Sequence, residues 1–283
     1  MNHETLTVTE HRRDQAGLTY IYPVLSRRAG GVSIGINLNL NRACNWNCVY
    51  CQVEGLHRGK PEAIQIELLL DELRGFLHEA LAGDYLARHV QEMAFRRLAD
   101  IAFSGDGEPT CADEFVAVMT GVVAVMREFE LIGRLPLRLI TNGSLVERKR
   151  TRAGLAILAS AGGDVWFKID RGDRAGLFAV NRTRLAPETA LRRLRASAEI
   201  APTWVQTCWF AHAGKAPDRR AKEHYLALLR QAAGFIEGIH LYGLARLPRQ
   251  GEMSGLTRLS PKALEAWGAE IQKKTGIKVC CSP

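Results

Sequence analysis

Strand-like and helix-like segments alternate along most of this chain, and this alternation constrains the fold more than any other feature. Strands rich in β-branched and apolar residues are expected at 32–40, 100–104, 136–141, 165–170, 204–210, 239–244 and 278–281. Helices are expected at 63–81, 112–130, 146–161, 187–200, 219–235 and 261–275, the last capped by Ser260. Strands that alternate with helices predict a parallel sheet built from βα units. Six or seven units in this length predict an α/β fold, a partial (β/α)6 barrel, with its site at the carboxyl ends of the strands.

The length of 283 residues suits one sizeable core rather than two. We expect three parts arranged around that core. They are an N-terminal extension over 1–31, the barrel core over 32–247, and a C-terminal helix and strand over 248–283 that pack on the core.

The charge of the chain is basic, with a formal net charge of +8 and arginines grouped at 27–28, 148–152 and 192–195. A basic protein attracts polyanions, so a nucleic acid or a phosphorylated or carboxylated substrate fits this charge. The arginines are not interleaved with aromatic residues, and a solvated basic surface is the favoured interpretation.

The cysteine count and the chain's hydropathy indicate the compartment. Seven cysteines are an odd number for a disulfide framework. The segment 1–17 is polar and lacks the apolar centre of a signal peptide, and the most apolar stretch, 115–126, is too short to span a bilayer. We therefore expect a cytoplasmic protein with reduced thiols and no membrane partner.

Three cysteines, Cys44, Cys48 and Cys51, follow the first predicted strand with the spacing C-x3-C-x2-C. Thiolates are the usual ligands of iron–sulfur clusters. Three of them leave one iron of a [4Fe-4S] cluster open, and an open position is where a metal centre does chemistry. The alternative is a structural zinc site with His57 as the fourth ligand.

A glycine-rich motif, Gly105-Asp106-Gly107-Glu108-Pro109-Thr110, follows the next predicted strand. Glycines let the backbone turn tightly and approach a ligand closely, and Glu108 places a carboxylate at the end of the strand. The alternative is an ordinary strand-to-helix turn with proline in the first helical turn.

Polar residues also end the later strands. Asn142 lies in an Asn-Gly turn, and Lys168 and Asp170 share one face of their strand. Charged groups that point into a barrel need a partner, which a ligand or each other can supply. Gln206 and Cys208 share a face of the following strand, and Arg246 after the sixth strand can hold a carboxylate or phosphate through two hydrogen bonds.

The cysteine spacing, with the aromatic Tyr50 before the third cysteine, resembles the signature of the radical S-adenosylmethionine (SAM) superfamily. The GEPT sequence at 107–110 resembles the branch that contains wyosine-type tRNA-modifying enzymes and pyruvate formate-lyase activases. The resemblance implies one [4Fe-4S] cluster on the three cysteines, with SAM on the open iron. The residues that it assigns to cofactor binding are Tyr50, Gly105, Gly107, Glu108, Pro109, Asn142, Lys168, Asp170, Gln206 and Arg246.

The function implied by this resemblance is the reductive cleavage of SAM to a 5′-deoxyadenosyl radical, which abstracts hydrogen from an unassigned substrate. The basic charge favours an anionic substrate, and a reductant such as flavodoxin or ferredoxin is the implied partner. One alternative is an enzyme that transfers a group or modifies a tRNA base by cleaving SAM differently, so oxidoreductase and transferase both stay open. Another is a non-catalytic metal- or nucleic-acid-binding protein.

The sequence departs from the wyosine-type pattern because no cysteine precedes Cys44, so a second cluster cannot be built there. The remaining cysteines are Cys111, Cys208, Cys280 and Cys281. Inert packing is the favoured interpretation for them, since cysteine is among the most buried residues. The adjacent pair Cys280 and Cys281 is the exception, and together with Lys168 it forms the set of catalytic candidates.

Overall fold

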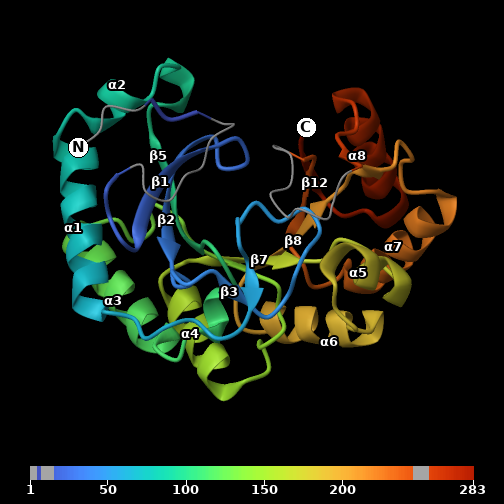
Figure 1. The fold of residues 1–283 in the computed structure, drawn as a ribbon, viewed down its shortest axis with the longest axis horizontal. Coiled ribbons are helices and arrows are strands. Elements are labelled where there is room, and N and C mark those ends of the chain that lie inside the picture. The colour runs from blue at the N-terminus through green and yellow to red at the C-terminus, as the bar shows by residue number, and fades with distance from the viewer. Residues whose placement is uncertain (1–4, 8–15, 245–254) are drawn as a thin grey trace.

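The computed structural model describes residues 5–7, 16–244 and 255–283. Within these residues the chain forms one curled sheet of eight strands, in the order β1-β2-β5-β6-β7-β8-β10-β12 (Figure 1). All neighbours pair in parallel except β1, which is antiparallel to β2. The strands are β1 Ile21–Ser26, β2 Gly31–Asn37, β5 Leu98–Ser104, β6 Leu137–Thr141, β7 Asp164–Lys168, β8 Thr203–Cys208, β10 Gly238–Tyr242 and β12 Val279–Ser282.

Helices follow the outer, convex face of this sheet, as Figure 1 shows for α1, α3, α4, α6 and α7. The α-helices are α1 Ile66–Ala82, α2 Tyr85–His89, α3 Phe115–Glu128, α4 Lys149–Ser160, α5 Arg174–Asn181, α6 Pro187–Ala198, α7 Arg219–Ala232 and α8 Pro261–Thr275. Short 3-10 helices, η1 Met93–Phe95 and η2 Pro109–Cys111, and two small strand pairs complete the elements. These pairs are β3 Ala43–Cys44 with β4 His57–Arg58, and β9 Ala211–His212 with β11 Leu256–Thr257. The predicted α/β partial barrel is confirmed.

The core lies between the sheet and the helices. Every residue of β2 is buried, as expected for a parallel strand that is covered on both faces. The α8 helix shows how local sequence sets an element, because it begins and ends at the predicted residues. The Ser260 side chain accepts a hydrogen bond from the Ala263 N–H at 3.2 Å, and Gly276 ends the helix in the left-handed conformation (φ 73°).

The sequence-based expectation omitted several elements, of which the strand β1 and the helix α5 are the longest. The strand β1 was not predicted, and it extends the sheet by a hairpin with β2. The helix α5 was also missed, although Asp173 caps it by accepting from the Gly176 N–H at 3.2 Å. The strand β12 was predicted as the last strand, and it pairs with β10 at the edge of the same sheet. The predicted boundaries at 31 and 247 stay predictions.

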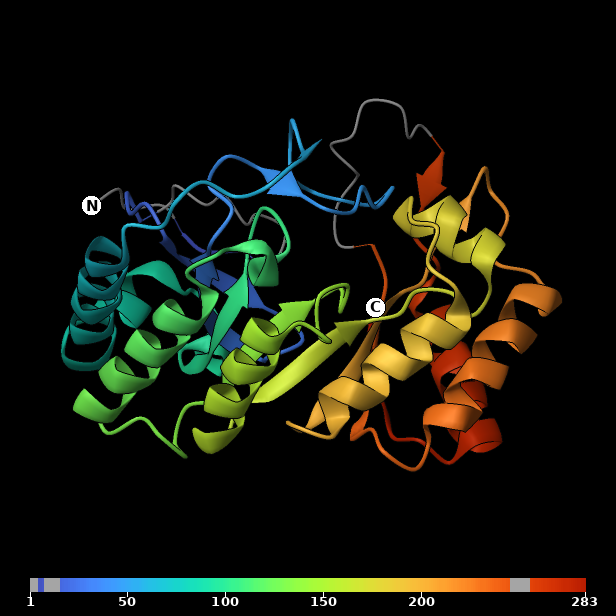
Figure 2. The ribbon, with the colours of Figure 1, turned by 90° about the horizontal axis from the view of Figure 1, so that it is seen from below.

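The carboxyl ends of the parallel strands face the segment that carries β3 and β4. Figure 2 shows this blue segment crossing the side of the sheet toward which the strand arrows point. A separate small apolar cluster, which includes Val49, Tyr50, Val180, Cys208 and Phe210, packs beneath it. None of the described helices combines the length and the apolar character that a membrane crossing requires.

Gly172 gives a test of this packing. A Cβ at Gly172 would lie 2.2 Å from the His224 carbonyl oxygen on α7, so backbone must move to admit a methyl group. Gly172→Ala is expected to lower the free energy of unfolding in urea by about 1–3 kcal/mol. The control Gly75→Ala, on α1 with nothing within 4 Å of the added Cβ, is expected to raise it by about 0.5–1 kcal/mol. Equal effects of the two variants would contradict this packing.

Candidate functional site

A cavity of about 330 Å³ opens at the carboxyl ends of the parallel strands. The cysteine loop covers one side of it, the strands β5, β6, β7, β8 and β10 line another, and the β1–β2 hairpin contributes Arg28 and Ser33. The predicted site residues that line it are Cys44, Cys48, Tyr50, Cys51, Gly105, Gly107, Glu108, Asn142, Lys168 and Gln206. Residues predicted from five separate stretches of sequence therefore meet at one place.

The three cysteines of the loop are thiols and not disulfides. The Cys48 sulfur accepts a hydrogen bond from Asn181 Nδ2 at 3.3 Å, and the Cys44 sulfur accepts one from the Trp46 N–H at 3.5 Å. Burial raises the pKa of both thiols to about 12, so each stays protonated at neutral pH unless a bound metal replaces the proton.

The donor set fits an iron–sulfur cluster. Thiolate sulfurs are the ligands that such clusters take, and N–H groups aimed at those sulfurs tune the cluster. Among the described residues, no group of three or more His, Cys, Asp or Glu side chains is close enough to hold a single metal ion. A four-iron cluster offers each cysteine its own iron and needs no such convergence. His57, the fourth ligand of the zinc alternative, is exposed on β4 and does not line the cavity.

A fully buried carboxylate, Asp170, lies behind the cysteine loop. It accepts hydrogen bonds from the Tyr50 hydroxyl at 2.6 Å, from Asn181 Nδ2 at 2.6 Å and from the Cys208 N–H at 2.7 Å. The three donors come from the cysteine loop, from the end of α5 and from β8. The Asp170 carboxylate thus fixes the loop against two elements of the barrel.

Lys168 reaches the cavity from the end of β7 and donates to the Tyr50 hydroxyl at 2.7 Å. Burial by itself lowers the pKa of Lys168, but nearby acidic groups, Tyr242 and Asp170 first among them, raise the pKa above its ordinary value overall. The side chain is therefore an ammonium at neutral pH. It is the cation next to the Cys48 sulfur, and its field lowers the pKa of that thiol against the effect of burial.

Glu108 is also buried, and four donors bind its carboxylate. Thr110 donates from N–H at 3.3 Å and from Oγ1 at 2.6 Å, Thr141 Oγ1 donates at 2.6 Å, and the Asn142 N–H donates at 2.6 Å. Burial raises the pKa of Glu108, although these hydrogen bonds act in the opposite direction. Within the part of the chain that the structure describes, Oε2 accepts from Asn142 alone, so this oxygen keeps a lone pair for a further donor.

At two positions of the motif, Gly105 and Gly107, there is no room for a side chain. A Cβ at Gly107 would lie 2.2 Å from the Ala43 carbonyl oxygen, and one at Gly105 (φ 137°) would lie 2.4 Å from Asn37 Oδ1. The glycine motif can therefore lie directly against the cysteine loop. Asn142 makes a second link, because its Nδ2 donates to Asn45 Oδ1 at 2.8 Å.

The other predicted residues lie elsewhere. Pro109 is buried at the start of η2, and Arg246 lies outside the described residues. The Cys281 sulfur lies against α8, where a Cβ at Gly268 would be 2.3 Å from it. The Cys280–Cys281 pair does not line the cavity. Cys281 thus contacts α8, and a chemical role for Cys280 or Cys281 stays a prediction.

Sequence reasoning missed two residues of the site and the part of the cavity farthest from the cysteines. Asn181 was not among the predicted site residues, and its contact with Cys48 depends on the unpredicted helix α5. Cys208 was assigned to inert packing, yet it lines the cavity beside Gln206. The far part, here called the inner end, is lined by Arg28, Ser33, Asp100, Trp166 and other residues.

His240 lies beside the inner end, between two tryptophans, stacked on Trp204 and tilted against Trp166. Its ring centroid is 4.2 Å from that of Trp166 and 4.7 Å from that of Trp204. Burial, assisted by nearby cations such as Arg28 and Arg138, lowers the pKa of His240 to about 3. The imidazole is neutral at any pH at which this protein is expected to work.

Curated proteins match parts of this chain at low sequence identity. No protein-family model matches the chain. Among curated proteins, 135 residues (48% of this chain) are 30% identical to "GTPase Obg" of Brachyspira hyodysenteriae and span 17% of its length. In a second match, 160 residues (56% of this chain) are 29% identical to "UPF0026 protein MJ1312" of Methanocaldococcus jannaschii and span 43% of it. The chain spans less than half the length of these two curated relatives.

Among solved structures, a radical SAM methyltransferase from Sphaerobacter thermophilus has a similar fold. The match has a TM-score of 0.62 and covers 93% of this chain and 68% of that chain, at 12% sequence identity. The chain therefore has the fold of the radical SAM partial barrel.

The buried imidazole predicts how stability depends on pH. In the unfolded chain His240 takes up a proton near pH 6.5, whereas in the folded protein it resists protonation down to about pH 3. Between these two pH values the His240 imidazole is protonated in the unfolded state and neutral in the folded state. The free energy of unfolding therefore falls as the pH drops from 6.5 toward 3. Between pH 7.5 and 4, wild type is expected to lose about 3 kcal/mol more free energy of unfolding than His240→Phe. His240→Gln, which also cannot be protonated, should behave like the phenylalanine variant. Parallel pH profiles for wild type and both variants would contradict a neutral, buried His240.

Proposed function

We propose that this protein is a radical SAM enzyme that holds one [4Fe-4S] cluster on Cys44, Cys48 and Cys51 and binds SAM beside it. One observation carries the proposal. The three cysteines line the same cavity as the polar residues that end the parallel strands, with Glu108 and Lys168 among them. A metal centre and an organic ligand can therefore share one enclosed space.

When bound, the cluster and SAM supply a reductive cleavage that gives a 5′-deoxyadenosyl radical, and the protein supplies position and a dry cavity. The sulfur of Cys48 is held by the Asn181 side chain and lies in the field of Lys168. Both contacts stabilise negative charge on the sulfur. The Asp170 hydrogen bonds keep Tyr50 and Asn181 in place around it.

The proposed SAM side of the cavity lies between the glycine motif and the end of β6. Glu108 Oε2 keeps acceptor capacity toward the cavity, which suits the ammonium of an amino acid moiety. Lys168 provides the cation that a carboxylate needs. Backbone at Gly105 and Gly107 and the side chain of Asn142 complete the lining on this side.

A second candidate is transfer of a methyl or other group from SAM. The similarly folded protein from Sphaerobacter thermophilus is named a methyltransferase, and this observation favours the candidate. The two reactions leave different products of SAM, namely 5′-deoxyadenosine from radical cleavage and other nucleosides from group transfer. An electron donor such as flavodoxin or ferredoxin belongs to the first proposal, and modification of a tRNA base is one form that the second could take.

Anaerobic reconstitution with iron and sulfide, followed by dithionite and SAM, tests the function. The wild type is expected to bind about four irons per chain and to form 5′-deoxyadenosine. Cys44→Ala, Cys48→Ala and Cys51→Ala are each expected to lose the product, because each removes a ligand. The matched control is Cys111→Ala, since Cys111 lies on η2 and does not line the cavity.

Three outcomes separate the proposals. Product from the wild type and from Cys111→Ala, with none from the three ligand variants, supports the radical reaction. Methylthioadenosine or S-adenosylhomocysteine in its place favours group transfer. A wild type that carries its iron but neither binds nor cleaves SAM contradicts both.

A further inference from the structure

We propose that the inner end of the cavity is the substrate subsite, where Arg28 binds an anionic oxygen group, a carboxylate or a phosphate. This inference rests on the proposed function, because it places the substrate in the same cavity as SAM. It adds the chemical class of the group that the enzyme recognises and names the residue that recognises it.

Arg28 lies in the turn between β1 and β2 and reaches across the open side of the barrel. Its Cζ is 4.7 Å from the ring centroid of Tyr242 on β10 and 5.3 Å from that of Trp166 on β7. Both rings line the cavity. Stacking on aromatic faces holds a guanidinium by cation–π attraction but supplies no hydrogen-bond acceptor.

The guanidinium of Arg28 has an N–H group that no acceptor among the described residues satisfies. Its Nη1 is buried and has no hydrogen-bond partner among the described residues. A buried donor without an acceptor costs free energy, and arginine carries five N–H donors in a planar fork. A carboxylate or phosphate in the cavity would satisfy this fork with two parallel hydrogen bonds.

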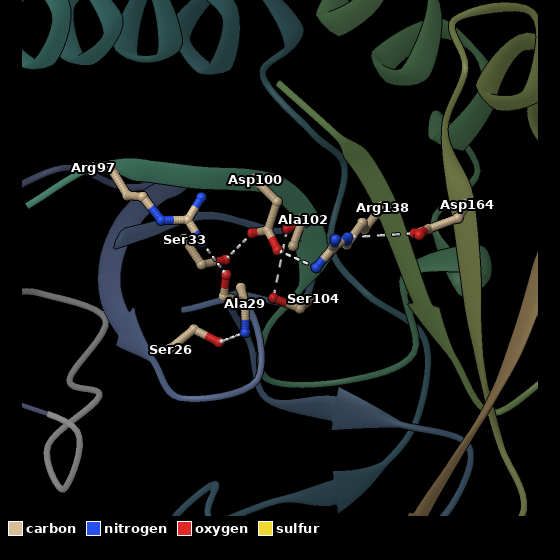
Figure 3. A network of polar contacts seen from close by, with 9 residues as sticks. All are labelled: Ser26, Ala29, Ser33, Arg97, Asp100, Ala102, Ser104, Arg138 and Asp164. Carbon is tan, nitrogen blue, oxygen red and sulfur yellow. Dashed lines mark hydrogen bonds and ion pairs between the residues drawn. The ribbon is translucent and has the colours of Figure 1, made fainter. Parts of the chain in front are cut away.

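The carboxylates nearby are engaged by other donors. Asp100 accepts from Arg138 Nη1 at 2.8 Å and from the Ser33 hydroxyl, and Arg138 Nε lies 3.5 Å from Asp164 Oδ1 (Figure 3). These four residues form one network on the inner face of the sheet. Asp100 contributes attraction to Arg28 at a distance but no hydrogen bond, so Arg28 is left facing the cavity as a cation.

The turn that carries Arg28 is fixed in place. Ser26 accepts from the Ala29 N–H through its hydroxyl at 3.1 Å and from the Gly30 N–H through its carbonyl at 2.8 Å, and Arg97 Nη2 donates to the Ala29 carbonyl at 3.1 Å (Figure 3). A Cβ at Gly31 would lie 2.7 Å from the Arg97 carbonyl oxygen, so the start of β2 packs tightly against the residue that precedes β5. A guanidinium on a rigid turn loses little freedom when it binds a ligand.

With Asp100 and Asp164 engaged by Arg138, the remaining charged groups around this end are cations, which favours an anionic ligand. Arg27 lines the same part of the cavity and donates to the Pro283 carbonyl, and Lys278 lies over the Trp204 ring at 5.5 Å. His240 is neutral there. The cavity runs without interruption from Arg28 to Lys168 and Cys48, so an anion held by Arg28 would extend the rest of the substrate toward the cofactor side.

Binding of small anions to the full-length reconstituted protein tests this assignment. The probes are benzoate, phenyl phosphate and, as the neutral control, benzamide, each titrated by calorimetry. Of the two anions, we follow the one that binds wild type more tightly. In Arg28→Gln its Kd is expected to rise at least about tenfold, because the variant loses one charge-assisted hydrogen-bonding contact. Arg28→Lys keeps the charge but loses the fork, and an intermediate Kd is expected. The stronger of the two anions identifies the source as a carboxylate or a phosphate.

The matched control is Arg220→Gln, which removes the same charge from an exposed position on α7 that lines a different cavity. Its Kd for the anions is expected to stay within about twofold of wild type, because an exposed charge at that range is screened. The affinity for SAM should be the same in wild type and in Arg28→Gln, since SAM is assigned to the other side of the cavity.

Several results would overturn the subsite. They are the absence of anion binding to wild type, equal weakening in Arg28→Gln and Arg220→Gln, or a loss of SAM affinity that matches the loss of anion affinity. If Arg28→Gln does not fold by circular dichroism, wild-type affinity in the folded Arg28→Lys would contradict the proposal. Arg28-dependent anion binding without SAM cleavage would remove the proposed function and leave the anion site standing, so the two failures are distinguishable.

Discussion

The buried carboxylate of Asp170 is the interaction on which the arrangement of the site depends. An isolated carboxylate in a protein interior is costly, and here three short hydrogen bonds from Tyr50, Asn181 and the Cys208 N–H offset that cost. Each donor belongs to a different element, so the carboxylate holds the cysteine loop, α5 and β8 in one geometry. Asn181 also donates to the Cys48 sulfur, and the Tyr50 hydroxyl also accepts from Lys168. The position of the Asp170 carboxylate therefore affects the positions of Cys48 and Lys168. Loss of the negative charge of Asp170 would weaken the contacts that hold the cysteine loop, α5 and β8 together.

The open form of the barrel gives the cavity two chemically different ends. At the carboxyl ends of the strands, Glu108 accepts from the Asn142 N–H and the Asn142 side chain donates to Asn45 of the cysteine loop, so polar groups lie beside the sulfurs. At the inner end, the unpredicted hairpin of β1 and β2 brings Arg28 across the open side onto Trp166 and Tyr242. The parallel strands thus carry the proposed cofactor side, and the added hairpin carries the proposed substrate side.

The sequence predicted those parts of the structure that local patterns determine. Apolar runs placed the seven parallel strands to within a few residues, and Ser260 with Pro261 placed the start of α8. Strand ends then brought the cysteines, Glu108 and Lys168 together, because parallel strands share one carboxyl edge. The hairpin strand β1 was missed because its pairing with β2 is antiparallel, outside the βα pattern, and because it contains Pro23.

Contacts that depend on curvature or on side-chain direction could not be predicted. Arg28 meets Tyr242 only because the sheet curls, and residues more than two hundred positions apart in sequence then face each other. The vicinal cysteines were taken as one unit, but alternation along β12 directs Cys281 toward α8. Asn181 required both α5 and its register against the cysteine loop, and neither follows from local pattern.

The central claim is that three cysteines hold a cluster with one iron open to SAM. Electron paramagnetic resonance of the dithionite-reduced, reconstituted protein, recorded with and without SAM labelled with ¹⁷O in its carboxylate and ¹⁵N in its amino group, tests that claim most directly. The account predicts that SAM changes the cluster signal and that hyperfine coupling to both labels appears. An intact cluster whose spectrum is the same with and without labelled SAM would contradict it.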